Sequence, residues 1–161
     1  LMVGTDIIEV SRIEKVIKEK GEIFLNRIYT KDEIDYCESK GSNKYQHYAG
    51  RFAAKESTFK AVKAFLHLYP GYICTDPDTD DYEIMDMPLK LKDIEIINVN
   101  PESKFTLEGG EPFVLFSQWN KKDSKKKPWF IPYTDEEATI HISISHIKEY
   151  AIAVANIQHY I

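Results

Sequence analysis

Hydrophobic and polar positions along the chain repeat with two different periods, and the period indicates the kind of element. Short β-branched segments with alternating polarity predict strands, whereas apolar residues three or four apart predict helices. The predicted strands cover residues 3–10, 92–99, 112–119, 139–146 and 150–157. The predicted helices cover residues 11–20, about 31–40, and 44–68. One strand, then helices, then several strands is the order typical of an α+β domain, and we expect a single domain over residues 1–161.

Turn and capping residues mark the ends of these elements. Ser11 with Glu14, and Thr30 with Glu33, have the spacing of a capping box at a helix N-terminus. Gly21 follows the first helix at the position where a glycine commonly ends one. The last two strands are separated only by "IKE", which predicts a hairpin.

Two charged segments lack any period, and we expect both to form surface loops. Residues 71–92 have an excess of acidic side chains, and residues 120–128 are rich in lysine. The stretch "DPDTDD" does not fit a calcium-binding loop, because Asp81 stands where glycine is needed and Met87 stands where glutamate is needed.

Composition narrows the class of protein. With 43% hydrophobic and 29% charged residues, the chain has the make-up of an ordinary globular domain. No apolar segment approaches the ~18 residues of a membrane span, and the opening residues lack the pattern of a secretory signal. Cys37 and Cys74 provide neither a disulfide framework nor metal-ligand spacing, which favours a reducing compartment.

The net charge of −5 comes from one segment. Residues 75–86 hold six acidic side chains and no basic one, so the remaining residues sum to +1. Residues 11–20 hold four basic side chains and two acidic ones. An acidic protein partner therefore fits this helix, and we expect neither a nucleic-acid nor a membrane partner.

The long predicted helix carries charged residues beside its apolar face. Glu56, Lys60 and Lys63 are spaced so that they fall on one side of the helix. An apolar seam, with residues spaced by seven, runs next to this side: Phe52, Phe59 and Leu66. Taken alone, Glu56 and Lys60 could be an exposed salt bridge, one helical turn apart.

Asp6 is unusual because it interrupts the first apolar strand. It either faces water from an edge strand or lies in the core, where a lone carboxylate is costly without a partner. Glu56 supplies a second carboxylate, and two carboxylates with an incoming phosphate suit Mg²⁺. Lys60 and Lys63 would then offset the remaining phosphate charge.

His146 ends the strand that precedes the hairpin. It is either a structural hydrogen-bonding residue or a residue that contacts a ligand or transfers a proton, while His141 in mid-strand is the weaker candidate for chemistry. Neither the common glycine-rich nucleotide-binding fingerprints nor a serine nucleophile elbow occurs in the sequence.

Three blocks together, "VGTDIIEVSRIEKVI", "RFAAKESTFKAV" and "IHISISHIKEYAIAVA", resemble the holo-acyl-carrier-protein synthase type of 4′-phosphopantetheinyl transferase. The resemblance implies a small antiparallel sheet with packed helices, assembled as a homotrimer with active sites between subunits. It also implies the activity: transfer of the phosphopantetheine arm of coenzyme A to a serine of apo-acyl carrier protein, with release of adenosine 3′,5′-bisphosphate. Such an enzyme belongs to fatty acid biosynthesis.

The resemblance assigns roles to individual residues. Asp6 and Glu56 match the residues that bind Mg²⁺, and Lys60 matches a lysine that contacts phosphate. Glu56 would activate the serine, directly or through a metal-bound water. The residues expected to contact coenzyme A, in addition to Lys60 and Lys63, are Arg51, Gly110, Pro112 and His146. Arg12 and Arg27 match basic positions that receive the acidic face of the carrier protein.

The chain departs from the family pattern in three places. Glu111 stands where the family usually has a basic residue, which affects the expected coenzyme contact. Residues 71–88 and 120–133 are insertions with no counterpart in compact family members. Two other functions stay open: a non-catalytic trimeric module that binds coenzyme A or carrier protein, and a Mg²⁺-dependent hydrolase that needs no carrier protein. We expect a cytoplasmic protein, with a plastid location after removal of a presequence as the alternative.

Overall fold

The structure is a computed structural model, and it describes residues 1–68, 89–98, 112–116 and 138–159. Its strands are β1 (Met2–Glu9), β2 (Ile94–Asn98), β3 (Pro112–Phe116), β4 (Ala138–His146) and β5 (Tyr150–His159). Its α-helices are α1 (Val10–Lys20), α2 (Glu22–Ile28), α3 (Lys31–Glu38) and α4 (Lys44–Leu68), with 3₁₀ turns η1 (Gly41–Asn43) and η3 (Leu91–Asp93). The α+β prediction is confirmed, and so are the terminal hairpin and the long helix.

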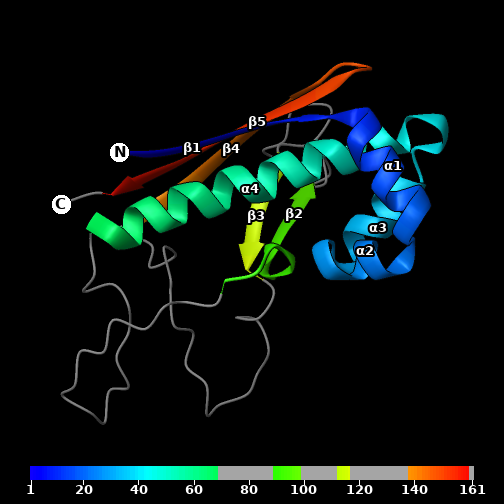
Figure 1. Ribbon diagram of the computed structural model, residues 1–161. Coiled ribbons are helices and arrows are strands. Elements are labelled where there is room, and N and C mark those ends of the chain that lie inside the picture. Colours follow the sequence, from blue (N-terminus) through cyan, green and yellow to red (C-terminus); the bar gives the residue numbers. More distant parts are fainter. Residues whose placement is uncertain (69–88, 99–111, 117–137, 160–161) are drawn as a thin grey trace, which may run out of the picture.

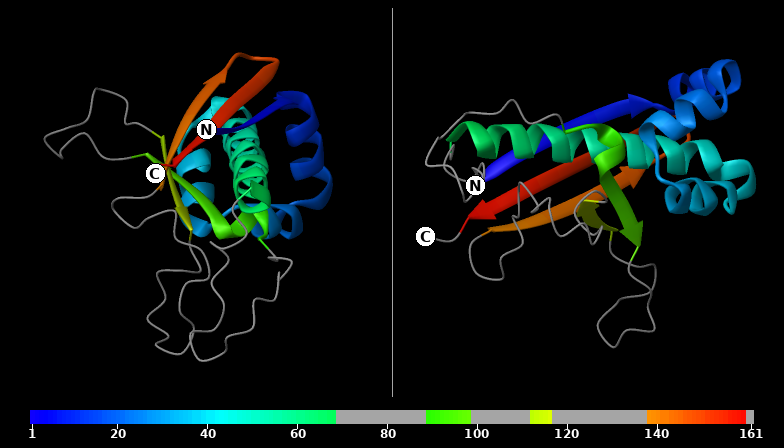
Figure 2. Two further views of the ribbon diagram at one scale, coloured as in Figure 1. Left: turned by 90° about the vertical axis from the view of Figure 1, so that its left-hand side faces the viewer. Right: turned by 90° about the horizontal axis from the view of Figure 1, so that it is seen from below.

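Two antiparallel sheets enclose the long helix. The larger sheet has the strand order β1-β5-β4, and the smaller one pairs β2 with β3. Helix α4 runs along one face of the larger sheet, with β2 and β3 on its other side and α1, α2 and α3 gathered at its N-terminal end (Figure 1). The views in Figure 2 agree that α4 is the central element.

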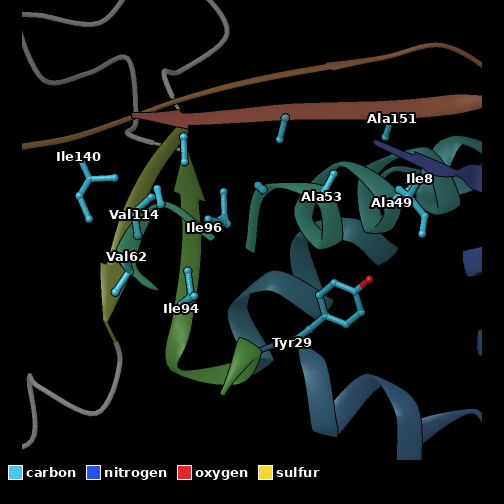
Figure 3. Close-up of a cluster of buried hydrophobic side chains, with 14 of the residues drawn as sticks. Ile8, Tyr29, Ala49, Ala53, Val62, Ile94, Ile96, Val114, Ile140 and Ala151 are labelled. Atoms are coloured by element: carbon cyan, nitrogen blue, oxygen red, sulfur yellow. The ribbon is translucent and has the colours of Figure 1, made fainter. Parts of the chain in front are cut away.

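Because α4 is surrounded, its buried residues are not confined to one stripe. Small residues such as Ala49, Ala53 and Ala61 are fully buried and let the strands approach the helix closely. The predicted seam is therefore only partly right: Leu66 is buried, but Phe52 and Phe59 lie at the margin of the core. Figure 3 shows where the two sheets meet around α4, with these side chains close together: Val62, Ile94, Ile96, Val114 and Ile140.

Glycine at position 4 allows the closest contact between β1 and α4. A Cβ atom added to Gly4 would lie 1.9 Å from the carbonyl oxygen of Ser57 and 2.7 Å from the amide nitrogen of Ala61. No side chain fits there, so only glycine at this position allows β1 to lie so close to the helix.

The structure confirms two of the predicted helix ends and corrects a third. Thr30 and Glu33 form a reciprocal capping box, and Gly21 ends α1 with a φ of 51°. Ser11 does not cap α1, because the helix begins at Val10 directly after β1. The Val10 amide instead donates to the carbonyl of Glu149 in the hairpin, at 2.9 Å. Tertiary contact thus replaces the side-chain cap.

Several predictions concern residues that the structure does not describe, and they stay predictions. These are the two insertions, Gly110, Glu111 and Cys74. Cys37 is buried, and burial raises the pKa of its thiol to about 12, so it is inert at neutral pH. None of the described helices is both long and apolar enough to cross a membrane.

Candidate active site

The contact between β1 and α4 brings together three charged residues that the sequence singled out. Asp6 lies on the same face of β1 as Met2, Gly4 and Ile8, which is the face that meets α4. Lys60 Nζ lies 2.9 Å from Asp6 Oδ1 and donates a second hydrogen bond to the Thr5 carbonyl at 2.8 Å. The Asp6 side chain is only 17% exposed. Asp6 is therefore a paired, mostly buried carboxylate and not one that faces water.

Glu56 lies one helical turn before Lys60 and completes this group. Partial burial raises the pKa of Glu56, the charge of Asp6 raises it further, and Lys60 partly opposes both. Within the described part of the chain, Lys60 forms its ion pair with Asp6 across to β1 and not with Glu56. The interpretation of Glu56 and Lys60 as an exposed salt bridge is therefore wrong.

The Asp6–Glu56 pair suits a hard divalent cation. Lys60 pairs with Asp6 alone, and the pKa of Glu56 is raised chiefly by burial and further by the charge of Asp6. No group of three or more potential metal-ligating side chains occurs among the residues that the structure describes. A site with two carboxylates is what Mg²⁺ uses when water and substrate phosphates supply the other ligands.

A pocket of about 170 Å³ lies at the other edge of the larger sheet. Helices α3 and α4 and the strands β2, β3 and β4 all contribute to it. The lining residues that bear on its chemistry are Tyr36, His47, Arg51, Asn98, Pro112 and His146. Three of the predicted coenzyme contacts, Arg51, Pro112 and His146, are thus brought to one place.

Arg51 is the fixed cation of this pocket. Its guanidinium lies over the Tyr36 ring, 3.7 Å from the centroid, and Nη2 donates to Asn98 Oδ1 at 2.9 Å. The side chain is buried, yet its Nε has no hydrogen-bond partner among the described residues. A guanidinium in the lining of a pocket suits a ligand that brings an anionic group.

Two histidines form another wall of the pocket. The rings of His47 and His146 meet edge to face with centroids 5.1 Å apart, and His47 also contacts Tyr36 at 5.7 Å. Burial, aided by His146, lowers the pKa of His47 to about 4, so His47 is neutral at physiological pH. His146 is exposed at the end of β4, and its ring contacts that of His47.

Three further predicted site residues, Arg12, Arg27 and Lys63, lie on helices. Arg12 on α1 and Arg27 on α2 are both exposed, as docking would require. Lys63 lies half-buried, close to one turn beyond Lys60, with its amine 5.7 Å from the Phe59 ring centroid.

Sequence reasoning missed Tyr36, His47 and Asn98 in the pocket, and the fully buried Lys55 next to Glu56. For two of these a signal existed: His47, Arg51 and Lys55 follow one another at intervals of four and so share a side of α4. No comparable pattern points to Tyr36 or Asn98, because other elements supply them.

Comparison with known proteins identifies the family. The sequence model of the 4′-phosphopantetheinyl transferase superfamily matches residues 2–155. The chain belongs to this superfamily. It is 34% identical over 155 residues to the holo-[acyl-carrier-protein] synthase of Ruminiclostridium cellulolyticum, covering 96% of this chain and 90% of that protein. It is 33% identical over 156 residues to the corresponding enzyme of Halothermothrix orenii, covering 94% and 91%.

Solved structures of the superfamily agree with the fold. The holo-(acyl-carrier-protein) synthase of Bacillus anthracis, in complex with CoA (3′,5′-ADP), superposes with a TM-score of 0.57 at 29% identity and covers 98% of this chain and 95% of that one. The Helicobacter pylori enzyme in complex with coenzyme A gives 0.59 at 25% identity, covering 98% and 100%. The predicted enzyme class, a holo-acyl-carrier-protein synthase of the 4′-phosphopantetheinyl transferase superfamily, is confirmed. The compartment stays a prediction, and the bacterial relatives give no support to the plastid alternative.

Proposed function

We propose that this chain transfers the 4′-phosphopantetheine arm of coenzyme A to a serine of apo-acyl carrier protein in a Mg²⁺-dependent reaction that releases adenosine 3′,5′-bisphosphate. The observation that supports it is the meeting of Asp6, Glu56 and Lys60 at the β1–α4 contact. Phosphoryl transfer requires positioning and charge neutralisation, and it needs no covalent protein nucleophile. Two carboxylates and a lysine at one place supply those requirements.

Each of the three residues has a distinct part in the reaction. Asp6 and Glu56 would hold Mg²⁺, which when bound offsets the charge of the coenzyme pyrophosphate. Glu56, whose pKa is raised chiefly by burial, would accept the proton of the serine hydroxyl, directly or through a water. The serine oxygen bonds to the phosphorus of the phosphopantetheine group as the bond from this phosphorus to the bisphosphate oxygen breaks. Lys60 donates to phosphate oxygens and stabilises the departing bisphosphate.

The pocket at the other sheet edge would take the adenosine end of coenzyme A. The positive charge of Arg51 would attract a phosphate group, and the His47 and His146 rings offer surfaces for the base or ribose. The structures of relatives from Bacillus anthracis and Helicobacter pylori contain coenzyme A or part of it, which supports this ligand.

The position of the two sites supports a trimer with shared active sites. Asp6 lies on β1 and His146 on β4, and β5 separates these strands in the sheet. If the β1 edge of one subunit meets the β4 edge of the next, one complete site forms at each interface, and such head-to-tail contacts close into a ring. The outer face of the sheet carries exposed apolar side chains suited to the centre of this ring: Val3, Ile7, Ile152 and Val154.

The carrier protein would dock beside this site. Arg12 and Arg27 are exposed on neighbouring helices, and an acidic protein surface is the partner that they favour.

Intact-mass analysis of apo-acyl carrier protein tests the proposed function. Incubation with this protein, coenzyme A and Mg²⁺ should add one phosphopantetheine arm, and a chelator should abolish the gain. Binding of coenzyme A without any gain in mass would indicate the non-catalytic module. Release of bisphosphate without carrier protein would indicate the hydrolase.

A further inference from the structure

An ion pair with no assigned role lies in the core of the protein, next to the catalytic glutamate in sequence. Lys55 Nζ and Glu33 Oε2 are 2.7 Å apart, and their side chains are 0% and 1% exposed. Lys55 directly precedes Glu56 on α4, and Glu33 lies on α3. No step of the proposed reaction uses either residue.

Both charges are fully hydrogen-bonded, and most of their partners are backbone groups. Lys55 Nζ also donates to the carbonyls of Ile94 and of Leu91, the latter at 3.2 Å. Glu33 accepts from the amide of Ile96 at 3.0 Å and from that of Thr30 at 2.8 Å. The ion pair therefore joins α3 and α4 to the beginning of β2 through the β2 backbone itself.

Stability alone does not account for a buried pair of this kind. Removing two charges from water costs several kcal/mol, and apolar replacements of similar volume are often neutral or stabilising. Burial lowers the pKa of Lys55 against the opposing effect of Glu33, which is the sign of that desolvation cost. What the pair adds is a fixed distance and direction between β2 and α4.

The second attachment of β2 to α4 lies at the ligand pocket. Arg51, one turn before Lys55, donates to Asn98 at the far end of β2. Asn98 pairs in register with Pro112 of β3, and both residues line the pocket. The strand is thus held at its start by Lys55 and at its end by Arg51.

We propose that the Glu33–Lys55 ion pair positions the pocket wall, because it fixes β2 on α4 so that Asn98 meets Arg51 and Pro112 closes the pocket. Both residues are positioning residues, since neither contacts the ligand. The proposal deepens the proposed function and rests on it for the identity of the ligand, coenzyme A. The geometric part, that the pair orders β2 and the Arg51–Asn98 contact, holds for any ligand.

The test uses the whole 161-residue chain with both charges removed by Glu33→Gln and Lys55→Met. The two new side chains are close in volume to the old ones, and the glutamine oxygen can still accept from the Ile96 amide. We expect the double variant to fold, and its Kd for adenosine 3′,5′-bisphosphate and its KM for coenzyme A to rise about tenfold. The KM for carrier protein and kcat should change less than twofold, because Asp6, Glu56 and Lys60 are untouched. Leu66→Ala, a core change on α4 that lies ~22 Å along the helix from Arg51, is the control for lost stability and should leave both coenzyme constants unchanged.

A readout without ligand separates this proposal from the proposed function. Amide hydrogen exchange in β2, measured by NMR, should accelerate in the double variant and not in Leu66→Ala. Unchanged exchange in β2, or unchanged coenzyme constants in a folded double variant, would overturn the positioning role. If wild-type protein does not bind the bisphosphate, the coenzyme assignment fails, while the exchange data still decide the geometric part. Should the double variant not fold, Glu33→Asp keeps both charges but shortens the reach, and wild-type coenzyme affinity in that variant would also overturn the proposal.

Discussion

At the scale of single residues, the proposed chemistry depends on Glu56. Its carboxylate is partly buried and lies near the negative charge of Asp6. Both raise the pKa of Glu56, and the positive charge of Lys60 only partly opposes this rise. A raised pKa makes the Glu56 carboxylate a better base. The same surroundings make the charged form of Glu56 unfavourable in the folded protein. Function and stability should therefore respond in opposite directions when this residue is changed.

Glu56→Gln should abolish transfer and stabilise the metal-free protein. A carboxyl whose pKa is raised by folding stabilises the fold only while protonated, and that contribution is lost as the pH rises through its folded pKa. At pH 7 the glutamine variant should therefore melt about 1–3 °C higher than wild type, and this gain should vanish near pH 4. Calorimetry in chelator measures the first effect, and the mass assay should show at least a ~100-fold loss of rate. Glu22→Gln, at an exposed position on α2, is the control and should alter neither.

The two neighbours of Glu56 should shift its pKa in opposite directions. Carboxyl ¹³C NMR titration of the metal-free protein measures this directly. Asp6→Asn removes the negative neighbour and should lower the pKa of Glu56, whereas Lys60→Met removes the positive one and should raise it. Lys63→Met serves as the matched control, since Lys63 lies further along the helix and is not a cause of the shift. Equal titration curves in all three variants would mean that the carboxylates do not interact.

At the scale of elements, the site depends on how closely β1 approaches α4. Periodicity predicted both elements, because β-branched runs and helical spacing are local properties. It could not show that α4 is buried on more than one side, or that Lys55 lies inside the core, because burial of a helix comes from the elements that surround it. The predicted cap at Ser11 was wrong for the same reason, because the first amide of α1 donates to the Glu149 carbonyl in the hairpin.

Gly4→Ala tests the β1–α4 contact. The new Cβ would lie 1.9 Å from a backbone oxygen, so β1 must move and the Asp6–Lys60 pair must separate. We expect unfolding free energy to fall by about 3 kcal/mol or more, measured by urea denaturation, with loss of transfer. Gly50→Ala is the matched change inside α4, where the nearest atom is a side-chain methyl of Ile144 at 3.2 Å. Because alanine favours a helix over glycine by ~1 kcal/mol, its stability should change little, and equal losses in both variants would contradict this explanation.

At the scale of the whole molecule, the residues of the proposed site lie at two edges of one sheet. Asp6 and Lys60 are 54 positions apart in sequence. The sequence predicted that Asp6, Glu56 and Lys60 share one site around Mg²⁺ and a phosphate, but not that Lys60 pairs directly with Asp6. The pocket was predictable only through the family resemblance, which supplied Arg51, Pro112 and His146. Tyr36 and Asn98 could not be predicted. They reach the pocket because α3 and β2 pack against α4, and such packing leaves no local pattern in the sequence.

The proposed transferase site combines carboxylates from one subunit with the pocket of the next. Subunit complementation examines this arrangement, with Glu56→Gln as the variant of the carboxylate half and Arg51→Met as the variant of the pocket half. Each should be inactive alone. Equal amounts, unfolded together and refolded, should recover about a quarter of wild-type transfer, because in random rings one interface in four joins two intact halves. No recovery from mixed oligomers that contain both variants would contradict this arrangement and place both halves of the site in a single chain.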